Sequence, residues 1–208
     1  MDHRDVPVAE RPSASGFWLH GGHVALDLVN TVLVANGELV DRLAAPEDLG
    51  RWTSVTSLGA RYGAPAEVDA QVFAQVIGLR GALKAGFDAI VAQERLPAAS
   101  LATINAILRS GPGSELRAEV GGGVSYGLRV DLARDSGPLP WLLADAGASL
   151  ISGDDAGLLR RCANHDSCVL LFLDTSRSHT RRWCSMEQCG NRSKVAAFNA
   201  RSRQAVNR

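Results

Sequence analysis

All four cysteines of this 208-residue chain lie between positions 162 and 189, and this grouping limits how its C-terminal part can fold. Cys162 and Cys168 are separated by five residues and Cys184 and Cys189 by four, with fifteen residues between the two pairs. Two close pairs joined by a spacer long enough for a hairpin are typical of a tetrahedral zinc site. The sequence therefore predicts one structural Zn²⁺ held by four thiolates, with His165 as the competing nitrogen ligand.

The charge of the chain is divided unevenly along its length. Residues 160–208 hold ten Lys and Arg against three acids, a net charge of +7, and residues 1–159 hold twelve against nineteen, a net charge of −7. Such asymmetry indicates a basic nucleic-acid-binding segment attached to an acidic body. The alternative is a solvated charged tail, which the cysteines in the same segment make less attractive.

The remaining composition is that of a globular protein, with 46% hydrophobic and 21% charged residues. No apolar run reaches the roughly 18 residues of a membrane-spanning helix. Residues 1–15 lack the apolar core of a signal peptide and are predicted to be a flexible leader. We therefore expect a cytoplasmic protein without membrane contact, in which paired cysteines are more often metal ligands than disulfides.

Apolar periodicity predicts a mainly helical body with a small β-hairpin, an α+β fold class. A short strand and a turn lead into the first helix, and Gly121 to Gly123 form the turn of the hairpin. The strand is expected at 17–19, the helices at 24–34, 46–58, 66–96, 101–108 and 138–159, and the hairpin at 114–120 and 124–132.

The cysteine-rich segment is predicted to fold as a treble-clef-like zinc finger. A strand at 169–173, a turn at 174–180 and a return strand at 181–183 would form its hairpin, and residues 191–205 its helix. Val195 and Phe198 would pack this helix on the hairpin. A segment this short buries too little surface to fold alone, so zinc would supply much of the folding free energy, about 10–16 kcal/mol.

Basic residues cluster in this segment and are candidates for DNA contact. Arginine donates two parallel hydrogen bonds and therefore suits phosphate and guanine recognition. Trp183 either stacks on a base or, as is more common for an aromatic in a hairpin, lies in the core. The candidate DNA-binding residues are Arg177, Arg181, Arg182, Arg192, Lys194, Arg201 and Arg203.

Two stretches resemble known families. The run WCSM at 183–186 followed by CGNR at 189–192, with LFLDTSR at 171–177 upstream, is similar to the CGNR zinc-finger family. LDLVNT at 26–31, followed by EDL at 47–49 and Trp52, resembles the ABATE domain found at the N-terminus of that family. One departure is the first cysteine pair, which is separated by five residues where the family pattern has four.

The resemblance implies a bacterial transcription regulator with a ligand-sensing ABATE-like domain at 16–159 and a DNA-binding zinc finger at 160–208. Its expected partners are double-stranded DNA and an unidentified small-molecule effector. Because one zinc module has a small footprint on DNA, we expect a homodimer. The competing interpretation is a zinc-built protein-interaction or RNA-binding module without sequence-specific DNA readout.

Two further interpretations concern the body and the metal. An enzyme is not expected, because four thiolates close the zinc shell and His20, His23 and Asp27 form the only tempting catalytic cluster. Asp27, Asn30 and Thr31 share a helix face and either line an effector pocket or make structural hydrogen bonds to the neighbouring hairpin. Oxidation of the zinc thiolates would also allow redox sensing, which the spacing leaves open.

Overall fold

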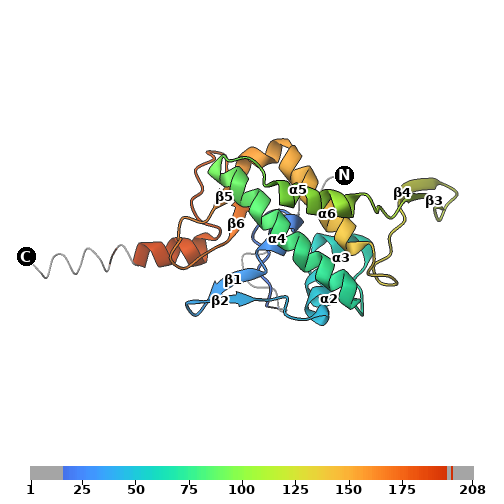
Figure 1. The fold of residues 1–208 in the computed structure, drawn as a ribbon, viewed down its shortest axis with the longest axis horizontal. Helices are drawn as coiled ribbons and strands as arrows, with labels where there is room; N and C mark the ends of the chain where they lie inside the picture. Colours follow the sequence, from blue (N-terminus) through green and yellow to red (C-terminus); the bar gives the residue numbers. More distant parts are fainter. Residues whose placement is uncertain (1–15, 196–197, 199–208) are drawn as a thin grey trace, which may run out of the picture.

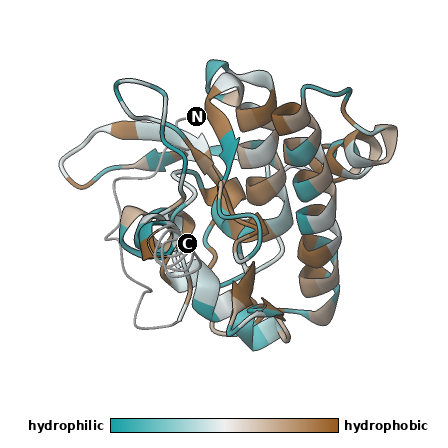
Figure 2. Ribbon diagram, turned by 90° about the vertical axis from the view of Figure 1, so that its left-hand side faces the viewer, coloured by the Kyte–Doolittle hydropathy of each residue, from teal (hydrophilic) through white to brown (hydrophobic). Residues whose placement is uncertain are grey.

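A computed structural model describes residues 16–195 and residue 198. Its centre is a long helix, α4, which packs against α1, α5 and α6 (Figure 1). Hydrophobic bands alternate with more hydrophilic ones along the helices (Figure 2). The helices are α1 (Val24–Val29), α2 (Pro46–Ser54), α3 (Ser57–Tyr62), α4 (Ala70–Ala92), α5 (Ala98–Leu108) and α6 (Leu139–Ser152).

The core forms where α4 meets its neighbours. Asp69 caps the start of α4 by accepting a hydrogen bond from the Gln71 N–H, at 2.7 Å. Along the helix, an apolar stripe is buried at Val76, Leu79, Leu83 and Phe87. Helix α6 approaches α4 closely through Gly147, where an added Cβ would lie 2.3 Å from Leu83 Cδ2. Larger side chains at this position would separate the two helices.

Within the described residues, three antiparallel two-stranded sheets lie around the helices. The hairpin of β3 and β4 was predicted and is confirmed, with its turn at Gly121 to Gly123. No described helix is long and apolar enough to cross a membrane. The strands are β1 (Val32–Ala35), β2 (Glu38–Asp41), β3 (Ser114–Ala118), β4 (Val124–Leu128), β5 (Leu159–Arg161) and β6 (Leu171–Leu173).

The first helix and the strand before it differ from the prediction. Residues 17–19 are not a strand, and the helix expected over 24–34 ends after six residues, at Val29. The chain then forms the β1–β2 hairpin around Asn36 and Gly37, which both have positive φ, 53° and 86°. An Asn-Gly pair between apolar runs is a strong hairpin signal, so this hairpin was within reach of the sequence.

The last helix is also shorter than predicted. Helix α6 ends at Ser152, and a 3₁₀ segment, η1 (Asp154–Leu158), precedes β5. Strand β5 pairs with β6, so the hairpin of the zinc module encloses the first cysteine turn. The prediction of a return strand at 181–183 is wrong, because those residues form no strand.

Strand β6 belongs to two cores at once. Leu171 and Leu173 point into the helical core, whereas Phe172 packs with Leu170 and the four cysteines. Successive side chains of a strand point to opposite faces, so three residues suffice to connect both cores. The zinc module is therefore built onto the body through a shared strand.

Candidate metal centre and basic surface

The four cysteine sulfurs form one compact group. Their Sγ atoms all lie within 4.8 Å of one another, with Cys168 and Cys184 at 3.6 Å and Cys184 and Cys189 at 3.7 Å. All four residues are buried. Tetrahedral zinc with Zn–S bonds of about 2.3 Å needs sulfurs roughly 3.8 Å apart. The sulfur group therefore fits one structural zinc ion.

Backbone hydrogen bonds bring the two cysteine pairs together. The Cys162 N–H donates to Leu170 O at 3.0 Å and closes the first turn, in which Ser167 N–H donates to Asn164 O. The Ala163 N–H donates to Arg182 O at 2.7 Å and ties the first turn to the segment before Cys184. Residues 165–167 form a turn between the cysteines of the first pair, and His165 in this turn is exposed and outside the sulfur group.

Of the second pair, Cys184 precedes a short π-helical turn, η2 (Met186–Gly190), and Cys189 lies within it; helical residues 191–195 follow. Ser185 caps this turn: its hydroxyl accepts from the Gln188 N–H, and its carbonyl accepts from the Cys189 N–H at 3.1 Å. This cap fixes the direction of Cys189 towards the other three sulfurs.

The four thiols shift one another's pKa, and a bound cation would allow all four to be deprotonated. Hydrogen bonds from Cys168, and then from Cys184 and Cys189, lower the pKa of the Cys162 thiol. The contacts with Cys162 raise the pKa of Cys168 and of Cys184. Four buried thiolates repel one another, so the group alone does not hold all four charges. A bound zinc ion keeps coordinating thiols deprotonated and so cross-links both turns.

The side chains of Asp174 and Arg181 hydrogen-bond to other groups of the zinc module and hold its loops together. The Asp174 carboxylate is buried and accepts from the Ser176 N–H and hydroxyl and from the Arg181 N–H. Burial by itself would raise the pKa of Asp174, but these hydrogen bonds outweigh it and the net pKa is lowered. The Arg181 guanidinium donates to the carbonyls of Trp183 and Cys184 and lies 4.6 Å from the centre of the Phe172 ring.

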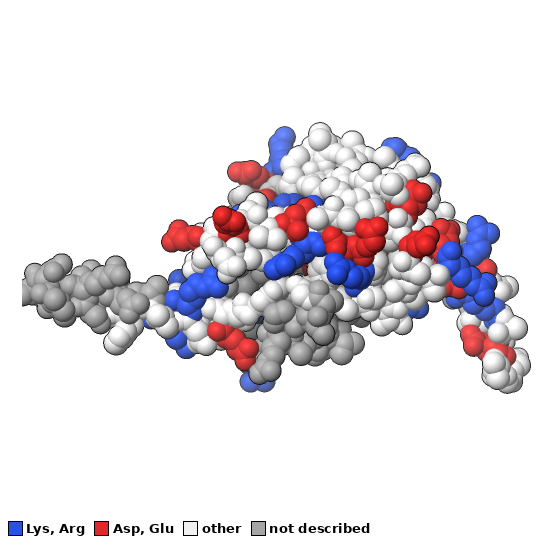
Figure 3. All heavy atoms as spheres, turned by 90° about the horizontal axis from the view of Figure 1, so that it is seen from below, with Lys and Arg blue, Asp and Glu red and all other residues white. Residues whose placement is uncertain are grey.

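The other predicted cations lie at the surface of the module. Arg177, Arg182, Arg192 and Lys194 are exposed. The Arg182 guanidinium lies 5.2 Å from the centre of the Trp183 ring, and Arg192 Nη1 donates to Ser167 O at 3.3 Å. Figure 3 shows Lys and Arg at the end where the chain leaves towards its C-terminus, with both charges mixed over the body. Arg201 and Arg203 lie outside the described residues.

The terminal helix does not pack as predicted. Val195 is 59% exposed and Phe198 is 63% exposed, so more than half of each side chain faces solvent instead of a core. The two side chains therefore leave apolar surface beside the exposed cations of the same helix.

The polar residues of α1 and the turn after it make structural hydrogen bonds. Asp27 Oδ1 accepts from the Gly21 N–H at 2.8 Å, and Thr31 Oγ1 donates to Leu28 O and accepts from Arg80. Asn30 donates to Leu171 O at 2.8 Å and accepts from the Leu171 N–H at 3.0 Å. Of the three residues, only Asn30 makes the hydrogen bonds to a neighbouring hairpin that the second interpretation describes, because Leu171 lies on β6, whereas Asp27 and Thr31 bond within the body.

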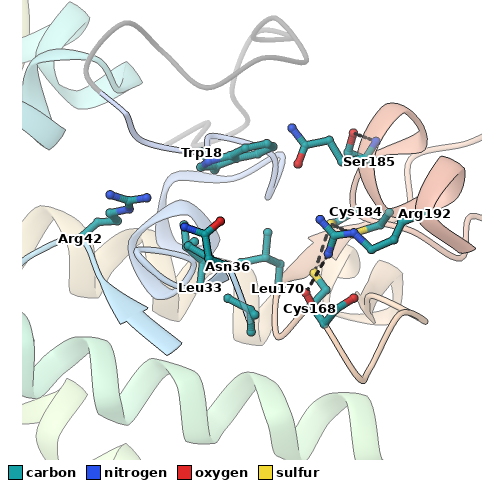
Figure 4. A pocket seen from close by; sticks show the side chains of 14 residues that line it. Trp18, Leu33, Asn36, Arg42, Cys168, Leu170, Cys184, Ser185 and Arg192 are labelled. Atoms are coloured by element: carbon teal, nitrogen blue, oxygen red, sulfur yellow. Dashed lines mark hydrogen bonds between the residues drawn. The ribbon is translucent and has the colours of Figure 1, made fainter. Parts of the chain in front are cut away.

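A pocket of about 260 Å³ lies between the β1–β2 hairpin and the zinc module (Figure 4). Trp18 forms one wall and Leu33 and Leu170 lie opposite, with Arg42 and Arg192 on either side. Cys168, Cys184 and Cys189 also line it, and none of the lining residues is acidic. Sequence reasoning missed this pocket, because its walls come from segments about 150 residues apart.

An ion pair made by a buried arginine with a more exposed aspartate was also missed. Arg80 of α4 donates to both carboxylate oxygens of Asp41, at 2.7 and 2.6 Å, and to Thr31 Oγ1 at 2.9 Å. The available signal was an arginine beside Leu79 on the buried stripe of a helix, since such cations are rarely buried without a partner.

Comparison with known families agrees with this geometry. A family model described as "CGNR zinc finger" matches residues 159–202, which include all four cysteines. The model of the ABATE family, described as "Putative stress-induced transcription regulator", matches residues 22–163. A search of curated proteins finds no match. Because its residues match the ABATE model over more than half of its length, this chain belongs to the ABATE family, and it carries a CGNR zinc finger.

Proposed function

We propose that the protein is a DNA-binding transcription regulator whose zinc module contacts the duplex. The observation that carries this proposal is the group of exposed cations, Arg177, Arg182, Arg192 and Lys194, on a segment folded around a metal site. Exposed guanidinium and ammonium groups supply phosphate contacts, which dominate affinity for DNA.

The two parts of the chain divide this work. Residues 160–208 are the DNA-contacting module in this proposal, and residues 16–159 are the sensing part. Arg201 and Arg203 extend the basic segment along the sequence. Arg181 is assigned a positioning role, because its guanidinium already donates to two carbonyls of the module.

The pocket between the β1–β2 hairpin and the zinc module is the better candidate for the effector site. Its walls belong to both parts of the chain, so an occupant would contact Arg192 of the basic surface and Trp18 of the body at once. Small molecules that raise the melting temperature of the wild type but not of Ala35→Trp, which fills the pocket, would locate the site. Equal stabilisation of both proteins would reject it.

The proposal is tested by selecting bound sequences from random duplex DNA with the zinc-loaded full chain. Arg182→Gln should then weaken binding to all duplexes and reduce the slope of log affinity against log salt by about one. Arg109→Gln, an exposed cation on the body, is the matched control and should leave both unchanged. Absence of any retarded duplex at low salt would contradict DNA binding.

A protein-interaction role is the second candidate, and exposed Val195 and Phe198 support it. Exposed apolar side chains on a short helix are typical of docking surfaces. Retention of a defined protein partner that Phe198→Ser abolishes, without DNA retardation, would favour this function. Competition between duplex DNA and RNA for the zinc-loaded protein separates the RNA-binding variant.

A further inference from the structure

The β3–β4 hairpin projects from the body at the end opposite the zinc module (Figure 1). The side chains of Leu116, Val124 and Tyr126 share one face of the hairpin and are 71%, 69% and 75% exposed. The other face carries Glu115 and Arg117. An isolated two-stranded hairpin is marginally stable in water, and contiguous exposed apolar side chains mark interaction sites.

At the outer edge of β3, the backbone groups form no hydrogen bond with another described residue. The Glu119 N–H donates to Gly123 O, and the Arg129 N–H donates to Gly113 O, so odd-numbered residues of β3 bond towards β4. Hydrogen-bonded pairs alternate along an antiparallel ladder. The backbone groups of Ser114, Leu116 and Ala118 therefore point away from β4, along an edge able to accept another strand.

The charges of β3 indicate which strand would fit that edge. Across the hairpin, Glu115 faces Gly127 and Arg117 faces Ser125, so neither has a charged partner on β4. Glu115 and Arg117 pair with each other along the strand, at 2.8 Å. A strand with an acid and a base two residues apart is complementary to a second copy of itself in antiparallel orientation.

We propose that two copies of this chain associate by pairing their β3 strands about a two-fold axis at Leu116. Leu116 then faces the partner's Leu116, and Glu115 faces the partner's Arg117 on each side of the axis. A shift of the axis by one residue, to Arg117, would set Arg117 against the partner's Arg117 and is repulsive. The axis at Leu116 uses every residue of β3, exposes no unpaired charge and joins the two apolar faces.

The same geometry sets the arrangement of the dimer. Antiparallel strands place the two bodies on opposite sides of the joined hairpins. Since hairpin and zinc module lie at opposite ends of each copy (Figure 1), the zinc modules lie at the two outer ends. This dimer would engage two separated DNA segments instead of adjacent half-sites, and its formation does not depend on DNA binding.

Charge exchange on β3 tests the pairing by sedimentation of the zinc-loaded full chain over a concentration series. The wild type should dimerise, and Glu115→Arg and Arg117→Glu should each weaken dimerisation by at least about tenfold, because both intermolecular pairs become repulsive. The double variant should recover the wild-type constant. Mixing the two single variants should produce a heterodimer, because an all-basic strand then meets an all-acidic one.

Glu119→Arg is the matched control, since Glu119 lies beyond β3 and outside the proposed pairs. It should dimerise like the wild type. Helical circular dichroism and zinc content establish that each variant is folded. A monomeric wild type, a dimer that Glu115→Arg leaves intact, or a mixture that stays monomeric would each overturn the proposal. Loss of DNA binding with normal dimerisation would count against the proposed function alone.

Discussion

Asn30, at the C-terminal end of α1, hydrogen-bonds to the backbone of strand β6 as a residue of an adjacent strand would. Its amide donates to and accepts from the backbone of Leu171, 141 residues away, in the way a neighbouring strand would. Because Leu171 is buried, its N–H and carbonyl need partners inside the protein. Asn30 supplies both, and so joins the body to the zinc module at one side chain.

Replacing Asn30 with Ala is expected to destabilise the protein by roughly 2–5 kcal/mol, since it leaves a buried N–H and a buried carbonyl unpaired. Urea unfolding of the zinc-loaded protein measures the loss. Asn105→Ala, an exposed position on α5, should change stability little. Unchanged stability of Asn30→Ala would instead return this residue to the group of ligand-binding candidates.

Asp41 gives the body a pH-dependent contact. Burial alone would raise the pKa of Asp41, but the hydrogen bonds from Arg80 and from the Leu43 N–H lower it below the ordinary value of 3.8. An acid with a lowered folded-state pKa stabilises the protein above its unfolded pKa. That contribution is lost as pH falls through the folded-state pKa.

We therefore expect Asp41→Asn to have a lower melting temperature than the wild type near neutral pH. The difference should close as pH falls below about 4, where the wild-type carboxylate also becomes protonated. Melting curves of both proteins along a pH series check this. Glu38→Gln, which removes an exposed carboxylate from the same strand, is the control; a gap that widens in acid would contradict the assignment.

Among the secondary-structure elements, strand β6 couples the stability of the helical body to that of the zinc module. One face of the strand lies in the helical core and the other against the cysteine turns. The Leu173 N–H also donates to Gly21 O, and the Asp174 N–H donates to Leu158 O. A second tie comes from Arg161 of β5, which pairs with Asp88 of α4 at 2.6 Å.

Removal of zinc is consequently expected to weaken the helical body as well as the cysteine turns. Chelation, or Cys162→Ser, should lower the melting temperature followed by helical circular dichroism by at least about 10 °C, with one transition for the whole chain. Restoring zinc to the chelated protein should reverse the change. An unaltered helical transition would mean that β6 stays in place without metal.

At the scale of the whole molecule, the surface charge of the body differs from that of the zinc module. Body residues of both signs are interspersed (Figure 3). On the described part of the zinc module, four exposed cations stand against two exposed acids, Asp166 and Glu187. The net charge of the chain is zero, but the local electrostatic field of the zinc module favours polyanions.

With about four phosphate contacts per module, affinity for duplex DNA should fall about 100-fold between roughly 50 and 200 mM salt. Fluorescence anisotropy of a labelled duplex measures this dependence. The zinc-free protein provides the control and should bind weakly at both concentrations. A decrease of less than about tenfold would mean that phosphate contacts are too few for the proposed surface.

The local elements were largely predictable because their signals are local. Apolar periodicity placed α4 and α5, glycines placed the β3–β4 turn, and cysteine spacing placed the metal site. The same reasoning extended the first helix over β1, because buried helices and buried strands give similar apolar runs. It also gave the zinc hairpin the wrong second strand, since pairing partners distant in sequence leave no periodic signal.

The sequence by itself determined the metal, its four ligands and the family, because thiolate chemistry and the motif depend on residues close together in the chain. The tertiary structure decided that β6 serves two cores, that Asn30 and Arg181 hold backbone groups in place, and that a pocket lies between the β1–β2 hairpin and the zinc module. These features arise from contacts between distant segments. The energies of such contacts depend on how deeply the groups are buried and on the direction of their hydrogen bonds, and local residue spacing predicts neither quantity.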